Sequence, residues 1–171
     1  MVIHMPSIAH FECSKCKATV PAGTPQTLCP KCAGSLYVRY DLNPLKGTAS
    51  RDAIATEAAR LPWAGMWRYR SVLPNVKPVT LGEGWTPMLR SRRYPNAYLK
   101  EEGANPTGSF KARGLALAVT MARHYGLRKL AVPSAGNAAG ALAAYCAAAG
   151  IEAHIFVPRD VPFANYVEAV A

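Results

Sequence analysis

Lys111 is the residue of this chain whose position most suggests covalent chemistry. Turn-forming residues from Gly103 to Gly108 are followed by Ser109, which can cap a helix, so Lys111 is expected in the first turn of that helix. A helix N-terminus disfavours a fixed cation and so favours the neutral amine, which is the form that attacks a carbonyl carbon. A solvated surface lysine is the alternative that the residue type alone favours.

Four of the five cysteines form two Cys-x-x-Cys pairs, Cys13 with Cys16 and Cys29 with Cys32. Each pair bends the chain so that both sulfurs face one point, and two such turns supply the four thiolates of a tetrahedral zinc site. Disulfide bonds are the competing explanation, but nothing in the sequence marks the chain as secreted. Four protein ligands leave no open position for catalysis, so we expect a structural zinc. Cys146 is expected to be a small buried side chain.

The segment Ser134-Ala-Gly-Asn137 lies between an expected strand and an expected helix. A strand, small residues and then a helix N-terminus present backbone N–H groups to an anion. A glycine-spaced turn of this kind is also a common packing device. Its functional interpretation therefore depends on Lys111.

Three motifs, in this order, resemble the pyridoxal-phosphate enzymes of the tryptophan synthase β family, and threonine synthases in particular. Asn105-Pro-Thr-Gly-Ser-Phe-Lys111 resembles the Schiff-base lysine motif, and Leu81-Gly-Glu-Gly-Trp-Thr-Pro87 resembles the segment that precedes it. Ser134-Ala-Gly-Asn137 resembles the substrate and cofactor loop. The resemblance covers roughly residue 36 to the end, and a zinc ribbon similar to residues 1–40 occurs at the N-terminus of some threonine synthases.

The resemblance implies that Lys111 holds pyridoxal phosphate as a Schiff base and moves protons as a general acid and base, with the cofactor as the electron sink. It also implies that Asn137 hydrogen-bonds the ring hydroxyl of the cofactor. Substrate contacts are expected from Thr86, Arg113, Ser134, Ala135, Gly136 and Asn137. The implied activity is that of a threonine synthase-like lyase, which converts O-phosphohomoserine and water to threonine and phosphate.

Two positions depart from the family pattern. Family members commonly carry Asn where this chain has Trp85, and many have an acidic residue where it has Ala112. Arg113 is expected either to contact acid groups in the site or to form a salt bridge. Dehydratases of serine or threonine, and cysteine or cysteate synthases, would use the same lysine and loop and are alternatives within the class. The segment from Leu81 to Gly84 favours threonine synthase.

The elements that must position these residues alternate between strands and helices. Strands are expected at 97–101, 128–133 and 152–158, the second of them buried, and helices at 51–61, 109–125, 138–149 and from 163 onward. The alternation predicts parallel βαβ units. With the resemblance, it predicts an incomplete doubly wound parallel α/β sheet of the type II pyridoxal-phosphate enzymes, preceded by a small β zinc ribbon. In the helix at 109–125 we expect a stripe of core-facing residues: Phe110, Gly114, Leu117, Met121 and Tyr125.

Three regions are expected: a zinc ribbon over 1–40, a linker and the start of the catalytic region over 41–95, and an incomplete pyridoxal-phosphate-binding α/β domain over 96–171. Asp41 to Gly47 is the expected linker, and Ser50 is the expected cap of the next helix. In this family the phosphate-gripping loop and the residue facing the pyridine nitrogen follow the Asn137 loop, and nothing after Gly150 matches them. We therefore expect the 171-residue chain alone to be inactive. The oligomeric state is open, with a homodimer as one candidate.

Composition and charge limit the classes of binding partner that we expect. Half of the residues (50%) are hydrophobic and 18% are charged, which predicts a packed core. The sequence has no apolar run of about eighteen residues and no signal-peptide pattern, so we expect a cytoplasmic protein with no membrane partner. The net charge of +10 raises the alternative of a zinc-ribbon module that binds nucleic acid. Because the basic excess lies mainly in residues 41–100 rather than in the ribbon, we expect no nucleic acid partner.

Overall fold

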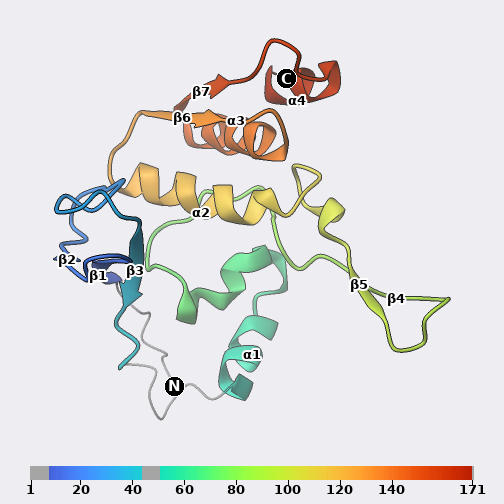
Figure 1. Ribbon diagram of the computed structural model, residues 1–171. Coiled ribbons are helices and arrows are strands. Elements are labelled where there is room, and N and C mark those ends of the chain that lie inside the picture. The colour runs from blue at the N-terminus through green and yellow to red at the C-terminus, as the bar shows by residue number, and fades with distance from the viewer. Residues whose placement is uncertain (1–7, 44–50, 171) are drawn as a thin grey trace. The chain divides into compact units, whose positions relative to one another are not determined.

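The computed structural model describes residues 8–43 and 51–170 (Figure 1). The chain forms two compact units, one of Met1–Pro62 with Trp67–Asn75 and the other of Trp63–Met66 with Val76–Ala171. The expected linker falls largely on residues 44–50, as does the expected cap at Ser50, and these lie outside the described residues.

The first unit contains a three-stranded antiparallel sheet in the order β2-β1-β3. Its strands are β1 (Ile8–Cys13), β2 (Thr19–Val20) and β3 (Leu36–Tyr40). Phe11 of β1 pairs with Val20 on one side and Val38 on the other, and the side chains of Phe11 and Val20 are buried. Cys13 is the last residue of β1, so the sheet fixes the position of the first cysteine.

Two helical segments follow in the chain, α1 (Arg51–Ala59) and a 3-10 segment, η2 (Pro62–Val72). Pro62 suits the start of η2 because a helix leaves its first N–H groups without internal partners. Arg70 of η2 and Glu57 of α1 form a salt bridge of 3.0 Å between Nε and Oε1.

The second unit contains a hairpin and an alternating set of helices and strands. The hairpin is formed by β4 (Met88–Arg90) and β5 (Tyr98–Lys100), and a short 3-10 turn, η3 (Glu102–Ala104), follows it. The remaining elements are α2 (Lys111–His124), β6 (Lys129–Pro133), α3 (Asn137–Ala149), β7 (Glu152–Phe156) and α4 (Phe163–Val170). The mixed α/β class that the sequence predicted is therefore confirmed.

Strands β6 and β7 pair in parallel from Lys129 opposite Glu152 to Pro133 opposite Phe156, with α3 between them in the chain. This confirms the predicted βαβ unit. Among the described residues the parallel sheet has only these two strands, so a complete doubly wound sheet is not seen. The prediction of a buried strand here is wrong, because exposed and half-buried residues alternate along both strands.

Helix α3 packs against α2, α4 and both parallel strands. It is rich in alanine, the residue with the highest helix propensity, and ends at Gly150, whose φ of +65° is the left-handed cap expected there. Helices α2 and α3 run in the same direction in Figure 1. Their first residues, Lys111 and Asn137, therefore lie at the same end of the helix pair.

The predicted buried stripe of α2 is wrong. Phe110 is 57% exposed, whereas Ala112, Ala116 and Val119 are completely buried. Contacting helices approach to about 8–10 Å, and alanine fits such a gap where phenylalanine would not. The helix also begins two residues later than expected, although Ser109 Oγ does accept a hydrogen bond of 3.3 Å from the backbone N–H of Lys111.

Other local predictions are confirmed. Gly126 follows the cap of α2 with a φ of +73°, and Cys146 is buried inside α3, where burial raises the pKa of its thiol. No helix within residues 8–43 and 51–170 combines the length and the apolar character needed to cross a membrane.

Candidate functional site

The four cysteine sulfurs of the first unit lie together. The Sγ atoms of Cys13, Cys16, Cys29 and Cys32 are all within 4.8 Å of one another, with 3.4 Å between Cys13 and Cys32 and 3.7 Å between Cys16 and Cys29. A disulfide needs about 2.05 Å, and all four cysteines are free. Four thiolates at about 2.3 Å from a tetrahedral zinc ion lie about 3.8 Å apart. The arrangement therefore fits one tetrahedral metal ion.

Each of the two Cys-x-x-Cys turns contains a backbone hydrogen bond of the same type. The residue four positions after the first cysteine donates its N–H to that cysteine's carbonyl, from Lys17 to Cys13 at 3.2 Å and from Ala33 to Cys29 at 2.8 Å. Lys17 and Ala33 both have a positive φ, of 59° and 54°. The two turns are thus matching local structures, each presenting a pair of sulfurs.

The surroundings of Cys13 favour the thiolate. The backbone N–H groups of Cys16 and Lys15 lie 3.5 and 3.4 Å from Cys13 Sγ. These hydrogen bonds, Cys16 first, lower the pKa of the Cys13 thiol to about 6, and the thiolate is the form that binds metals. A Cβ atom at Gly34 would lie 3.0 Å from Cys13 Sγ, so the backbone closes tightly on the sulfurs.

In the second unit, Lys111 is the first residue of α2, and its Nζ lies 4.6 Å from the centre of the Phe110 ring. No salt bridge to Lys111 is found among the described residues. The amine is therefore carried by the first residue of a helix and lies over an aromatic ring, and within residues 8–43 and 51–170 no carboxylate forms a salt bridge with it.

The lysine motif is hydrogen-bonded to the motif that precedes it. Asn105 is 5% exposed, and its Oδ1 accepts a hydrogen bond of 3.0 Å from the backbone N–H of Gly84. Its Nδ2 donates to the backbone carbonyl of Glu102 at 2.8 Å. The segments 81–87 and 105–111, which the sequence singled out separately, thus form one hydrogen-bonded structure.

Arg113 and Thr86 also belong to this structure. Arg113 binds the Glu102 carboxylate with both Nε (2.7 Å) and Nη2 (2.8 Å), and Thr86 Oγ1 donates to Glu102 Oε1 at 2.6 Å. The hydrogen bonds from Arg113 and then Thr86 lower the pKa of the Glu102 carboxyl to about 2. Of the two roles expected for Arg113, the salt bridge is the one seen. Sequence reasoning missed Glu102 as its partner.

Glu83 connects the same segment to α3. Its side chain is completely buried, and Oε2 accepts hydrogen bonds from Tyr145 Oη (2.7 Å), Leu81 N (3.0 Å) and Thr80 Oγ1 (3.1 Å). Burial, and then the hydrogen bond to Glu83, raises the pKa of Tyr145. Neither residue was predicted. The glycines on both sides of Glu83 were the available signal, because they permit a turn that points this side chain inward.

The loop from Ser134 to Asn137 leads from β6 into α3. The backbone N–H of Ser134 donates to Phe156 at 3.1 Å, Ser134 Oγ accepts from Gly136 N at 3.3 Å, and Asn165 Nδ2 donates to the carbonyl of Ala135 at 2.6 Å. Asn137 is exposed, and no side chain caps the helix. The N-terminus of α3 therefore has the polarity that binds an anion, with the N–H of Ala139 already bonded to the carbonyl of Gly136 at 2.7 Å.

These groups fit pyridoxal phosphate in kind, since a primary amine and a helix N-terminus lie at the same end of two packed helices (Figure 1). The comparison with known families agrees. The model of the family described as "Pyridoxal-phosphate dependent enzyme" matches residues 79–169, which is more than half of the chain. The chain belongs to this family.

Known threonine synthases are similar to this pyridoxal-phosphate family member. That of Methanosarcina acetivorans is 36% identical over 156 residues, which covers 87% of this chain and 37% of the relative. That of Methanocaldococcus jannaschii is 36% identical over 157 residues (86% and 37%), and that of Mycobacterium leprae is 43% identical over 107 residues (57% and 30%). The chain is thus a threonine synthase homologue that spans a little over a third of the length of the two Methanosarcina and Methanocaldococcus relatives.

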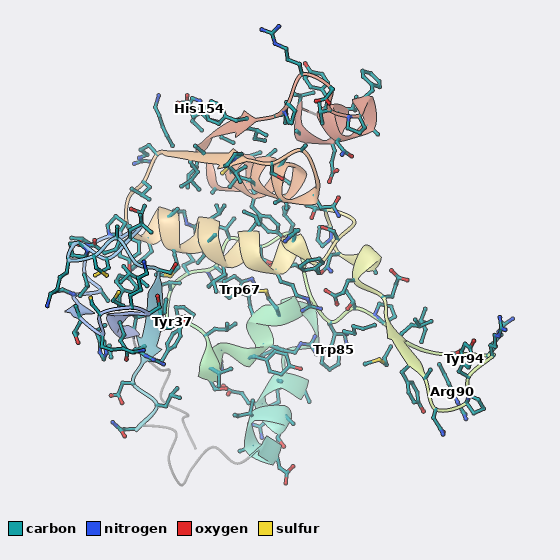
Figure 2. The ribbon with its side chains drawn as sticks, viewed as in Figure 1. Tyr37, Trp67, Trp85, Arg90, Tyr94 and His154 are labelled. Atoms are coloured by element: carbon teal, nitrogen blue, oxygen red, sulfur yellow. The ribbon has the colours of Figure 1, made fainter. Side chains whose placement is uncertain are left out.

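The matched range of the pyridoxal-phosphate family begins just before Leu81 and contains Lys111 and the 134–137 loop. The cysteine cluster precedes it and indicates a zinc-binding N-terminal module. The β4–β5 hairpin, from Met88 to Lys100, lies inside this matched range. Figure 2 shows Arg90 and Tyr94 toward the tip of this hairpin, and both are exposed.

Proposed function

We propose that this chain serves a threonine synthase-like lyase reaction, the conversion of O-phosphohomoserine and water to threonine and phosphate. The observation that carries the proposal is the hydrogen-bonded joining of the two motifs around Lys111, in a chain of the pyridoxal-phosphate family. The names of its relatives support threonine synthesis as the specific reaction.

In this proposal Lys111 binds the cofactor through Nζ and transfers protons at the substrate carbons. The N-terminus of α3, with Ser134, Ala135 and Gly136, binds the substrate carboxylate, and Asn137 binds the ring hydroxyl of the cofactor. Pyridoxal phosphate, when bound, would supply the electron sink. Thr86 and Arg113 bind Glu102 and orient the start of α2, and they border the substrate position.

We further propose a structural zinc on Cys13, Cys16, Cys29 and Cys32, with no catalytic role. The ribbon would occupy residues 1–40, a linker and the start of the catalytic region 41–95, and the pyridoxal-phosphate-binding α/β domain 96–171. The two parallel strands would form part of the doubly wound sheet expected of the type II pyridoxal-phosphate enzymes.

The cofactor assignment is tested by incubating the chain with pyridoxal phosphate, reducing with borohydride and mapping the labelled peptide. We expect the label at Lys111, and we expect Lys111→Ala to lose it while keeping its circular dichroism spectrum. Lys129→Ala, at a lysine side chain that is 67% exposed, is the matched control and should label normally. A label on Lys100 or another lysine would overturn the assignment.

The reaction class is tested by supplying O-phosphohomoserine, and separately serine and threonine, to the chain loaded with cofactor. Threonine and phosphate formed together support the lyase proposal. A 2-oxo acid formed from serine or threonine would instead indicate a dehydratase. Because the 171-residue chain alone is expected to be inactive, labelling at Lys111 without any product is the result that this expectation predicts, whereas neither labelling nor product would overturn its assignment as part of a lyase.

A further inference from the structure

The segment from Glu83 to Thr86 is hydrogen-bonded to both helices of the candidate site. Gly84 N donates to Asn105 in the lysine motif, and Thr86 Oγ1 accepts a hydrogen bond of 3.2 Å from Arg113 Nη2 in α2. Glu83, at the other end of the segment, accepts a hydrogen bond from Tyr145 in α3. One short segment thus has side-chain or backbone hydrogen bonds to the start of α2 and to the body of α3.

The backbone of this segment is held in place. Gly82 and Gly84 have φ angles of +94° and +89°, which lets the chain turn on both sides of Glu83. The carbonyl of Glu83 accepts a hydrogen bond of 2.7 Å from Met66 N, and a Cβ atom at Gly65 would lie 2.1 Å from that oxygen. The Glu83 carboxylate is therefore a fixed anchor and not a mobile side chain.

Packing between α2 and α3 cannot fix the position of α3 to the same degree. The buried residues of α3 other than Leu142 and Tyr145 are small, and the buried residues of α2 are small or β-branched, including Ala112, Ala116 and Val119. Such small side chains form shallow ridges, which oppose sliding along the helix axis only weakly. The directional hydrogen bond between Tyr145 and Glu83 supplies the missing restraint.

We propose that Glu83 and Tyr145 are positioning residues that hold the 134–137 loop in register with Lys111. Tyr145 lies eight residues after Asn137, about 12 Å along a continuous helix, so a shift of Tyr145 along the axis moves the loop equally. The loop is where the proposed function places the substrate carboxylate, and this part of the inference rests on that function. Neither residue contacts the substrate in this proposal.

Hydrogen exchange measured by mass spectrometry tests the restraint without any ligand. We expect Tyr145→Phe to speed amide exchange about tenfold in 81–86 and in 134–139, since one hydrogen bond is lost, and to leave 105–111 unchanged. Glu83→Gln keeps an acceptor oxygen for Tyr145, so its effect should be smaller. Tyr166→Phe in α4, at an exposed tyrosine, is the matched control. The inference would be overturned if faster exchange were confined to 141–149. It would also be overturned if exchange at 105–111 increased as much as exchange in 81–86 and 134–139.

A second readout separates positioning from general stability. With pyridoxal phosphate present, Tyr145→Phe should weaken O-phosphohomoserine binding about tenfold, as measured by calorimetry, while the rate of reductive labelling at Lys111 stays within about twofold. The proposal is contradicted if substrate affinity and the labelling rate at Lys111 fall together, or if neither of them falls. If the unaltered chain neither labels nor binds substrate, the proposed function fails, and the exchange experiment still decides whether Glu83 and Tyr145 restrain the loop.

Discussion

In the ribbon, every sulfur of the candidate metal site comes from residues 13–32, whereas the groups around Lys111 come from segments as far apart as Glu83 and Tyr145, which are 62 positions apart. The ribbon site depends on two local turns with matching hydrogen bonds. The lysine region depends on contacts that exist only when distant segments have packed. A single change should therefore act on the ribbon through the metal, and on the lysine region through tertiary structure.

The largest effect is expected from Cys29→Ser. Loss of one thiolate should lower the zinc content from one equivalent to almost none and unfold residues 8–40, because metal binding supplies much of the folding free energy of small zinc modules. Metal analysis and circular dichroism measure this. Cys146→Ser, outside the cluster, should keep its zinc. Zinc retained by the first variant or lost by the second would remove the distinction between the two regions.

Gly65→Ala should be the most damaging small change in the second unit. The added methyl group would lie 2.1 Å from the Glu83 carbonyl, and the φ of Gly65 is +53°. We expect a loss of about 3 kcal/mol in the free energy of unfolding, measured in urea. In the ribbon, nothing lies within 4 Å of the methyl group that Gly23→Ala would add. This control should change the free energy of unfolding by less than about 0.5 kcal/mol. Equal effects would show that Glu83 is not a fixed anchor.

Arg113→Met tests the Glu102 cluster through pH. The Glu102 pKa is lowered from an ordinary value near 4.5 to about 2 in the folded chain. The ionised carboxylate therefore stabilises the folded chain fully above pH 4.5, and this stabilisation is lost as the pH falls through about 2. The unaltered chain should lose about 2 kcal/mol of stability across that interval. The variant loses the largest cause of this lowering, the Arg113 hydrogen bonds, but keeps those from Thr86 and Asn105, so its stability should depend less steeply on pH.

Arg70→Met is the matched control for this pH experiment, because Arg70 pairs with Glu57 with its side chain 52% exposed. Exposed pairs contribute about 0–1 kcal/mol, so the pH profile should match that of the unaltered chain. A profile that is equally steep in Arg113→Met would mean that other carboxylates dominate acid unfolding.

The smallest effect is expected at Trp85, which is 60% exposed and has a φ of +54° (Figure 2). Asparagine adopts this left-handed conformation more readily than tryptophan, so Trp85→Asn should raise the free energy of unfolding by about 0.5–1 kcal/mol. Trp85→Ala removes the ring but keeps most of the backbone cost, and it measures what the ring contributes. Destabilisation by both substitutions to the same extent would show that the ring matters more than the backbone.

The cysteine spacing predicted a cluster because each turn is encoded within a few residues, and Gly126 and Gly150 ended their helices for the same reason. Burial was harder to predict. Phe110 is the most hydrophobic residue near the start of α2, but the packed face uses alanines, since close helix contact selects small volume over hydrophobicity.

The hydrogen-bonded side chains of the lysine region show a second limit. Glu102 and Tyr145 gave no local signal, and the only signal for Glu83 was its two flanking glycines, because the partner of each side chain is determined by tertiary contact. Arg113 and Thr86 were singled out as separate substrate contacts, and nothing in their spacing indicated that both bind the Glu102 carboxylate. The proposed roles of Lys111 and the 134–137 loop rest on motif resemblance and stay predictions.

The two matching turns of the ribbon are joined by residues 21–28, which are almost all exposed and contain no regular secondary structure. Each turn is complete without this connector, so the connector acts only as a tether between two half-sites. Doubling the length of such a tether costs only about 0.6 kcal/mol in loop-closure entropy. We therefore expect that a peptide tag or a fluorescent reporter inserted near Gly23 would leave the cysteine cluster intact.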